Sequence, residues 1–214
     1  MTDARRGRFI SLEGGEGAGK STLLAALREH IAGQGIDLVQ TREPGGTTVG
    51  EAIRAIVLDP RTRGMAAETE LLLMFASRAQ LVRETLAPAL AAGQWVLCDR
   101  YVDASYAYQG GGRCQPQERI AELESWACGG LVPDLTLLLD LPVATGRARA
   151  AGRGEADRIE TEADAFFERV RASYRARAAA EPRRFRVIDA GQSPEAVLQA
   201  AIAALAPLFA GDAA

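Results

Sequence analysis

The sequence predicts an α/β protein in which helices cover both faces of a five-stranded parallel sheet. Two observations lead to this fold class. Short, mostly apolar runs alternate along the chain with longer segments of helical periodicity. Several of the short runs are apolar without alternation, which is typical of strands buried on both faces.

The expected strands and helices follow one another in regular order. The strands are expected at 8–13 (RFISLE), 37–42 (DLVQTR), 95–99 (WVLCD), 134–141 (DLTLLLDL) and 184–190 (RFRVIDA). The helices are expected near 19–33, 48–58, 68–92, 116–128, 143–151, 163–180 and 194–209. Because each pair of strands is separated by a helical segment, the strands should run parallel.

The composition indicates one globular domain covering residues 1–214. The chain is 48% hydrophobic and 25% charged, and it has no repeat, low-complexity tract or long linker. A net charge of -3 argues against a nucleic-acid or membrane partner. The first residues lead into a strand without an apolar signal segment, so we expect a cytoplasmic protein whose three cysteines are free thiols.

A phosphate-binding motif follows the first expected strand. Residues 14–21 read GGEGAGKS and match the P-loop pattern, with a strand before the motif and an amphipathic helix after it. Glycines let backbone N–H groups turn toward a phosphate, and the helix N-terminus adds its positive end. We therefore predict a three-layer P-loop NTPase fold. The residues expected to bind the nucleotide are Gly14, Gly15, Glu16, Gly17, Ala18, Gly19, Lys20, Ser21 and Thr22.

Lys20 is the only lysine of the chain, and the other 24 of its 25 basic residues are arginines. A compact ammonium group fits a nest of backbone groups that a planar guanidinium would not fit. Lys20 should therefore contact the β- and γ-phosphates and act in catalysis. The Ser21 hydroxyl should be a ligand of Mg²⁺.

The P-loop by itself does not identify the reaction. The chain contains no asparagine, so it lacks the Asn-Lys-x-Asp motif with which GTPases read their base. Motor and remodelling ATPases usually need a longer chain. A small kinase is the favoured class, and a nucleotide-binding switch without turnover is the alternative.

Charged side chains follow two of the expected strands. Arg42 lies just past the second strand, and Asp99 and Arg100 lie at the end of the third. In open parallel sheets, ligands bind beyond the carboxyl ends of the strands. Two arginines there can hold an acceptor phosphate, and Asp99 can hold Mg²⁺ directly or through water. A regulatory switch would not need such an acceptor site.

Sequence blocks along nearly the whole chain resemble those of bacterial thymidylate kinases. The similar blocks, in the order and spacing of that family, are EGGEGAGKST, TREPGGT, LLLMFASRAQLV, CDRYVDASYAYQGGGR, PDLTLLLDL and RGEADRIE. The resemblance implies an enzyme that transfers the γ-phosphoryl group of ATP to dTMP, with Mg²⁺, for dTTP synthesis. A kinase for another nucleoside monophosphate is the nearest alternative.

The resemblance also implies roles for individual residues. Arg42 and Arg100 resemble the arginines that bind the acceptor phosphate, and Glu16 resembles the carboxylate near the 3′-hydroxyl of the sugar. Phe75 and Arg78, one helical turn apart, resemble the pair that stacks on thymine and donates to its O4. The remaining acceptor contacts are Ser105 and Gln109 at the base edge and Tyr108 at the 2′ position of the sugar.

The charged segment 147–161 is expected to act as a short lid. Gly17 stands where eukaryotic-type relatives carry arginine, so the lid should supply the missing positive charge. We expect Arg153, between Gly152 and Gly154, to reach the transferring phosphoryl group. Arg149 is expected to contact ATP.

Two further expectations concern the acceptor loop and assembly. Ala104 stands where many relatives carry serine, so a local hydrogen bond is expected to be either lost or taken over by Ser105. The segment 68–92 has more apolar positions than one buried stripe needs, and relatives dimerise through helices. A homodimer is therefore expected.

Overall fold

The computed structural model describes residues 6–151 and 157–210. Its centre is a five-stranded sheet with the strand order β2-β3-β1-β4-β5, and all four strand pairs are parallel. The strands are β1 (Phe9–Gly14), β2 (Leu38–Arg42), β3 (Trp95–Asp99), β4 (Leu135–Asp140) and β5 (Phe185–Asp189). The predicted fold class is therefore confirmed, and each predicted strand is present within one residue of its expected bounds.

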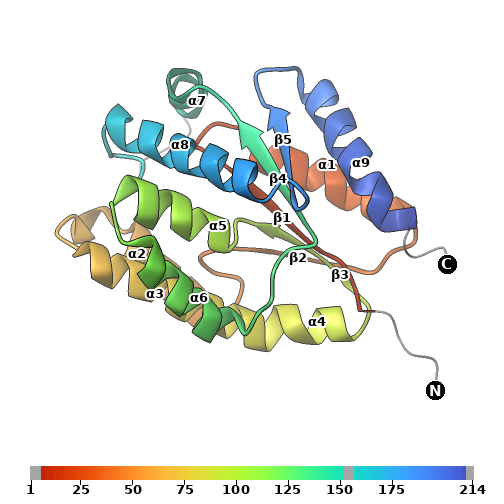
Figure 1. Ribbon diagram of the computed structural model, residues 1–214, viewed down its shortest axis with the longest axis horizontal. Helices are drawn as coiled ribbons and strands as arrows, with labels where there is room; N and C mark the ends of the chain where they lie inside the picture. The colour runs from red at the N-terminus through yellow and green to blue at the C-terminus, as the bar shows by residue number, and fades with distance from the viewer. Residues whose placement is uncertain (1–5, 152–156, 211–214) are drawn as a thin grey trace.

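Helices cover both faces of the sheet (Figure 1). The α-helices are α1 (Lys20–Gly33), α2 (Thr48–Leu58), α3 (Ala67–Leu81), α4 (Ala87–Ala91), α5 (Val102–Ser105), α6 (Gln117–Cys128), α7 (Val143–Ala150), α8 (Asp164–Ala180) and α9 (Pro194–Ala210). Three shorter turns of other types join them: the 3₁₀ turn η1 (Pro60–Thr62) and the π-helical turns η2 (Val82–Leu86) and η3 (Tyr106–Gly112). None of the helices described is long and apolar enough to cross a membrane.

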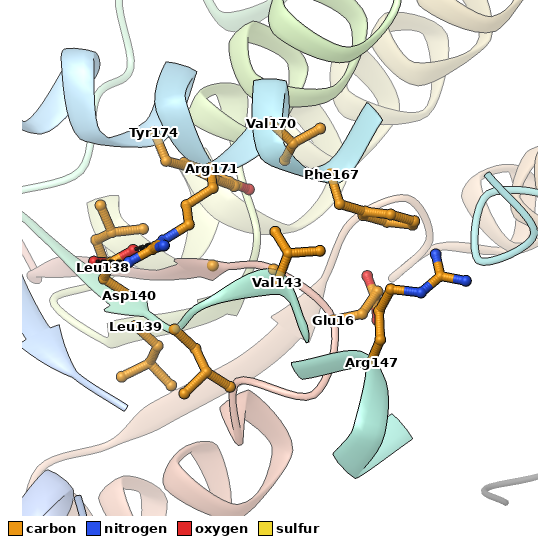
Figure 2. A pocket seen from close by; sticks show the side chains of 13 residues that line it. Glu16, Leu138, Leu139, Asp140, Val143, Arg147, Phe167, Val170, Arg171 and Tyr174 are labelled. Atoms are coloured by element: carbon orange, nitrogen blue, oxygen red, sulfur yellow. Dashed lines mark hydrogen bonds and ion pairs between the residues drawn. The ribbon is translucent and has the colours of Figure 1, made fainter. Parts of the chain in front are cut away.

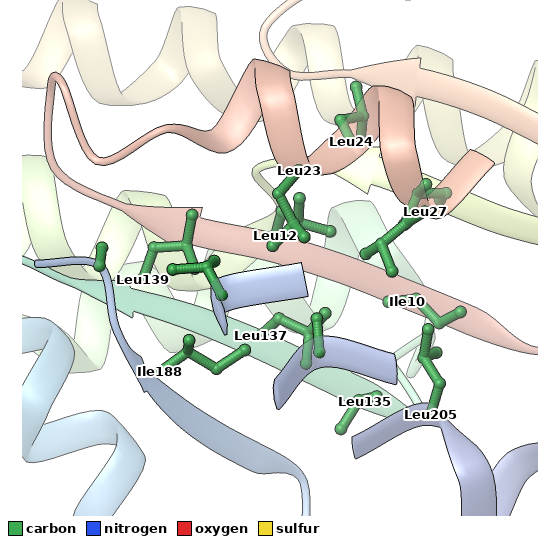
Figure 3. Packing of buried hydrophobic residues seen from close by; sticks show 14 of the residues in the cluster. Ile10, Leu12, Leu23, Leu24, Leu27, Leu135, Leu137, Leu139, Ile188 and Leu205 are labelled. Atoms are coloured by element: carbon green, nitrogen blue, oxygen red, sulfur yellow. The ribbon is translucent and has the colours of Figure 1, made fainter. Parts of the chain in front are cut away.

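Alternate residues of β1 face the two sides of the sheet and divide the core. Ile10 and Leu12 pack with α1 and α9, as Figure 3 shows. Phe9 faces the other side and packs with residues of α3 and α6. Further along that side, α8 covers β4, where Val170 and Tyr174 lie in the same cluster as Leu138. These two layers of helices fix β1 at the centre of the molecule.

The topology places a crevice at the carboxyl end of β1. The chain leaves β1 toward β2 and β3 on one side and later returns to β4 on the other side. This change of direction is the point at which open α/β sheets bind ligands. The register aligns the strand ends, because Leu12 and Arg42 each pair with Asp99. The ends of β1, β2 and β3 therefore meet at one edge.

The structure corrects two helical expectations. The segment 68–92 is not one helix, because the wide turn η2 separates α3 from α4. Pro88 lies at the start of α4 and has no N–H to donate, so the regular bonding pattern cannot run through it. No helix was predicted over 102–112, but the structure forms α5 and η3 there. The glycines at the end of this segment lower its helix propensity, so propensity does not predict a helix here.

Candidate functional site

The P-loop joins β1 to α1 and folds around the ammonium group of Lys20. Gly14, Gly17 and Gly19 have positive φ values of 140°, 70° and 90°, which allow the backbone to turn tightly. Lys20 Nζ donates to the carbonyl oxygens of Gly14 and Gly15 at 3.1 and 3.0 Å. Burial and the nearby charge of Arg100 lower the pKa of Lys20, although Glu16 opposes this shift. The ammonium therefore lies inside a nest of backbone atoms, as predicted.

The P-loop leaves no space for a side chain at Gly17. A Cβ atom there would lie 2.0 Å from the carbonyl oxygen of Gly146 in α7. A Cβ atom on Gly146 would in turn lie 2.3 Å from the carbonyl oxygen of Glu16. The P-loop and α7 thus pack backbone against backbone. This contact excludes an arginine at position 17 and gives a physical reason for the glycine.

A polar cavity of about 240 Å³ opens beside the P-loop. It brings together residues from the P-loop, α1, α2, α3, α5, η3, the ends of β2 and β3, and the predicted lid. Its lining includes Glu16, Gly17, Ala18, Gly19, Lys20, Ser21, Thr22, Arg42, Glu43, Pro44, Arg54, Met74, Asp99, Arg100, Ala104, Tyr108, Gln109 and Asp157. Most of the predicted site residues therefore lie at one cavity.

The Arg100 side chain is held at this polar cavity by hydrogen bonds to several groups. Its guanidinium donates to the Gly14 carbonyl, to Glu16, and to the hydroxyls of Tyr108 and Tyr174, at 2.8 to 3.0 Å. Burial alone would lower the pKa of Arg100, but the tyrosines and Glu16 outweigh it and hold the pKa well above its usual range. Arg100 is therefore a fixed positive charge beside the P-loop.

The carboxylate of Glu16 is ionised in this setting. Burial alone would raise the pKa of Glu16, but the charges of Lys20 and Arg100 and a hydrogen bond from Tyr108 lower it below the usual value. The Tyr108 hydroxyl donates to Glu16 at 3.1 Å. Glu16 thus offers a negative acceptor between two cations, where it can receive a hydroxyl group of a ligand.

A second arginine lies at the open edge of the polar cavity. Arg42 pairs with Glu51 of α2 at 2.9 Å, and both side chains are about half exposed, at 53% and 44%. Such an exposed pair contributes little stability and can exchange partners. Arg42 is therefore available to an anionic ligand at small cost.

Arg78 and Phe75 do not line the polar cavity but are buried behind the residues that do. The Arg78 guanidinium pairs with Glu43 at 2.6 Å, donates to Ser105 Oγ at 3.0 Å and lies 4.6 Å from the centre of the Phe75 ring. Burial raises the pKa of Glu43, and the charge of Arg78 opposes the shift. Glu43 lines the polar cavity, and its Oε1 atom is buried without a hydrogen-bond partner among the residues that the structure describes. The predicted base contacts of Phe75, Arg78 and Ser105 stay predictions.

Gln109 and Ala104 do reach the polar cavity. Gln109 donates through Nε2 to Glu70 at 2.9 Å, while its Oε1 atom is buried without a partner among the described residues. Ala104 lines the cavity where many relatives carry a serine. Ser105 is not part of the cavity lining, and its hydroxyl accepts a bond from Arg78.

Few side chains at the polar cavity could bind a metal ion. Ser21 and Asp99 both line the polar cavity, and the Oδ1 atom of Asp99 is buried without a partner in the described part of the chain. No group of three or more acidic, cysteine or histidine side chains suited to a metal occurs among residues 6–151 and 157–210. One carboxylate and one hydroxyl fit Mg²⁺, which usually keeps several waters and binds phosphate oxygens of the substrate.

A second, largely apolar cavity of about 460 Å³ lies on the other side of the P-loop. It is lined by Leu23 and Ala26 of α1 and by Pro194, Val197 and Leu198 of α9. Arg149 lies at this apolar cavity and donates to the Ala190 carbonyl at 2.8 Å. Both cavities include Gly17, Ala18, Gly19 and Thr22.

A third hollow lies under the P-loop between β4, α7 and α8 (Figure 2). Its volume is about 30 Å³, which is room for little more than one water molecule. Figure 2 shows Arg171 paired with Asp140 on one side of it and Arg147 near Glu16 on the other. This hollow is too small for a nucleotide, although Gly14, Gly15 and Glu16 line it.

The predicted lid spans the end of α7 and the chain beyond it. Arg153 lies outside the described residues. Arg147 donates to the Glu162 carbonyl at 2.7 Å and pairs with Asp164 at 3.0 Å. Arg158, near the end of the predicted lid, is buried and donates to Glu70 at 2.6 Å. This end of the lid is therefore anchored to α3.

Sequence reasoning missed several residues of the site. Arg54 lines the polar cavity and donates to the Pro44 carbonyl at 2.9 Å. Tyr174 and Glu13 lie behind Arg100, where the Tyr174 hydroxyl donates to Glu13 at 2.7 Å. Burial raises the pKa of Glu13 to about 8, and the charge of Asp103 adds to the shift. The one sequence signal that could have pointed to Glu13 is its position, because an acidic residue inside an apolar strand is unusual.

Comparisons with known proteins agree with this geometry. The family described as thymidylate kinase matches residues 12–201. The chain is 61% identical to a thymidylate kinase of Alkalilimnicola ehrlichii over 94% of its own length and 93% of that protein's. It is 57% identical to a thymidylate kinase of Ectopseudomonas mendocina over 94% and 95% of the two lengths.

A solved structure is also similar. The crystal structure of thymidylate kinase from Ehrlichia chaffeensis superimposes with a TM-score of 0.77 at 29% sequence identity. The match covers 94% of this chain and 98% of that one.

Replacing Gly17 by alanine tests the contact between the P-loop and α7. The left-handed backbone costs an alanine about 1–2 kcal/mol, and the new Cβ atom must also push α7 away. We expect Gly17→Ala to lower the melting temperature by at least about 4 °C, since 1 kcal/mol corresponds to about 2–4 °C in a chain of this size. Thermal unfolding followed by circular dichroism measures the change.

Gly33→Ala is the matched control, because a Cβ atom at the end of α1 meets nothing within 4 Å. We expect this control to melt at or above the wild-type temperature. A Gly17→Ala protein that melts with the wild type would show that α7 does not rest on the P-loop.

Proposed function

The chain belongs to the thymidylate kinase family, and we propose that it transfers the γ-phosphoryl group of ATP to dTMP, giving dTDP and ADP for dTTP synthesis. One observation carries the proposal. The polar and apolar cavities share the P-loop residues Gly17, Ala18 and Gly19 and, at the start of α1, Thr22. Two ligands, one in each cavity, would therefore bring their phosphates together at Lys20.

We propose that ATP binds with its base in the apolar cavity. Leu23 and Leu198 offer apolar surface there, and Arg149 adds a charged side chain at the edge. The phosphates would then follow the P-loop from Gly14 and Gly15 through Ala18 and Gly19 to Lys20, where backbone N–H groups and the start of α1 favour negative charge.

The polar cavity is the proposed site of dTMP. Arg100 and Arg42 would bind its phosphate, and Glu16 would accept from the 3′-hydroxyl of the sugar. The Tyr108 hydroxyl is held by Arg100 and Glu16, which supports its role as a wall at the 2′ position. The base would lie toward Gln109 and Met74, with Phe75, Arg78 and Ser105 behind Glu43 and Ala104.

The proposed reaction requires no general base. A phosphate monoester is largely a dianion near neutral pH and is already a nucleophile. His30, the only histidine of the chain, lies on α1 and contacts Phe209 of α9 instead of either cavity. Catalysis then rests on alignment of the two phosphates and on neutralisation of their charge.

We propose that Mg²⁺ is held by Ser21 and Asp99. The Oδ1 atom of Asp99, which is buried without a partner among residues 6–151 and 157–210, supports this assignment, because a buried carboxylate oxygen normally has a partner. When bound, the ion would neutralise charge on the β- and γ-phosphates. The chain's own part is to present the carboxylate at the end of β3 and the hydroxyl at the start of α1.

Arg153 is the proposed lid residue for the transferring phosphoryl group. The described lid arginines already have partners, since Arg147 pairs with Asp164 and Arg149 donates to Ala190. Gly17 adds no charge near the γ-phosphate, so a cation from the lid is needed there.

We further propose a homodimer that works in the cytoplasm. Leu72 of α3 and Trp126 of α6 are exposed at 58% and 81%, and these two helices pack against each other. An exposed apolar face of this kind supports assembly. All three cysteines are free, which suits a reducing compartment.

A substrate panel tests the proposed activity. The wild-type protein is mixed with ATP, Mg²⁺ and one monophosphate at a time, either dTMP, dUMP, dCMP, dAMP or dGMP, and ADP formation is measured. We expect dTMP to give the highest kcat/KM, with little ADP formed when the acceptor is omitted. ADP formation that is equal with and without dTMP would contradict the proposal.

Replacement of Lys20 by arginine tests the geometry of the nest. We expect Lys20→Arg to lower kcat by about 100-fold or more, because a planar group cannot take the ammonium's place between the Gly14 and Gly15 carbonyls. Arg28→Lys, the reverse exchange at an exposed position of α1, is the control and should keep wild-type kinetics. A Lys20→Arg enzyme with near wild-type kcat would show that charge alone suffices.

A further inference from the structure

Glu70 is a buried carboxylate that the proposed reaction does not use. Its side chain is 1% exposed, and it lies on α3 among three donors from distant parts of the chain. Gln109 Nε2 donates to it at 2.9 Å, Arg158 Nη2 at 2.6 Å and Arg113 Nε at 3.2 Å. Glu70 therefore joins α3 to η3 and to the end of the predicted lid.

The charge of Glu70 is fixed by these contacts. Burial alone would raise its pKa, but the hydrogen bonds from Gln109 and Arg158 and the charge of Arg113 lower it below the usual value. An ionised carboxylate has only acceptor atoms. A side-chain amide that bonds to it must therefore present its NH₂ group, whatever else surrounds the amide.

This requirement fixes the direction of the Gln109 amide. Its Nε2 atom faces Glu70, so its Oε1 atom is left for another partner. That oxygen is buried and has no hydrogen-bond partner among the described residues. Gln109 lines the polar cavity. Since buried acceptors normally receive a hydrogen bond, the missing donor should come from a ligand in that cavity.

We propose that Glu70 is a specificity-determining positioning residue, which holds the Gln109 carbonyl toward the cavity so that the site selects a pyrimidine carrying a ring N–H. This inference rests on the proposed function and refines its substrate choice. Thymine and uracil carry N3–H, whereas cytosine has a bare N3 acceptor at the same place. A base that places an acceptor against Gln109 Oε1 would leave two buried acceptors facing each other with no proton between them. The site should therefore bind such a base much more weakly.

Arg158 and Arg113 assist by keeping Glu70 in place. Arg158 is also held by the Val57 carbonyl, to which its Nε donates at 2.8 Å. Arg113 pairs in addition with Glu162, close to α8. The carboxylate is thus fixed from both sides and cannot turn away from Gln109. Glutamine at position 70 would remove the constraint, because its amide offers both a donor and an acceptor.

The test compares dTMP with 5-methyl-dCMP, which keeps the methyl group and the ring but reverses the hydrogen-bonding character of N3. The ratio of kcat/KM for the two substrates is measured with ATP and Mg²⁺ for the wild type and for Glu70→Gln. We expect the wild type to favour dTMP and Glu70→Gln to lower that ratio at least about tenfold, since Gln109 can then present its NH₂ group. A purely structural role would lower both kcat/KM values by the same factor.

Glu68→Gln is the matched control, because Glu68 is exposed on the same helix. Its ratio should stay within about twofold of the wild type. If Glu70→Gln does not fold, Gln109→Met serves instead, because it removes the acceptor and should also lower the ratio at least about tenfold.

An unchanged ratio in the folded variant, Glu70→Gln or its substitute Gln109→Met, would overturn the inference while leaving the proposed function intact. A wild-type protein that does not phosphorylate dTMP would overturn both.

Discussion

The site depends on the backbone at Arg100. Its φ of 71° is a left-handed conformation that residues other than glycine rarely adopt. Two hydrogen bonds to β1 hold this turn: the Arg100 N–H donates to the Leu12 carbonyl at 2.9 Å, and the Tyr101 N–H donates to the Glu13 carboxyl group at 2.7 Å. Because β3 ends in this turn, the guanidinium reaches the Gly14 carbonyl and Glu16 of the P-loop. A strained residue held in place by its surroundings is typical of functional sites.

The same strand supports both cavities. β1 ends in the P-loop, whose Gly17 packs against Gly146 of α7, so the apolar cavity and the start of the lid share one rigid base. On the side of the polar cavity, Tyr174 of α8 reaches Glu13 and Arg100 together. The end of the predicted lid is tied to α3 through Arg158 and Glu70. Buried pairs of this kind are poor sources of stability but fix geometry, which is what alignment of two phosphates requires.

Sequence patterns revealed the parts of the molecule that rest on local chemistry. The P-loop, the alternation of strands and helices, and the arginines after two strands are all visible as short motifs, and the structure brings Lys20, Arg42 and Arg100 to one cavity. What the patterns could not reveal depends on contacts between distant segments. Glu70 and Glu13 look like ordinary acids in apolar segments, and only the fold supplies their donors Arg158 and Tyr174, 88 and 161 positions away. The π-helical turn at Val82–Leu86 likewise depends on packing and on Pro88 rather than on helical propensity.

The most direct test of this account is the affinity of the Tyr174→Phe protein for dTMP. The substitution keeps the ring but removes the hydroxyl between Glu13 and Arg100, so we expect dTMP to bind about tenfold more weakly. The affinity for a non-hydrolysable ATP analogue should stay within about twofold, because that ligand does not depend on Arg100. Tyr106→Phe is the control, because it loses a tyrosine–glutamate bond of the same 2.7 Å length outside both cavities. Isothermal titration calorimetry measures the six dissociation constants, two for each of the wild type and the two variants. Unchanged dTMP affinity in Tyr174→Phe, or equal losses for both ligands, would contradict the central place of Arg100.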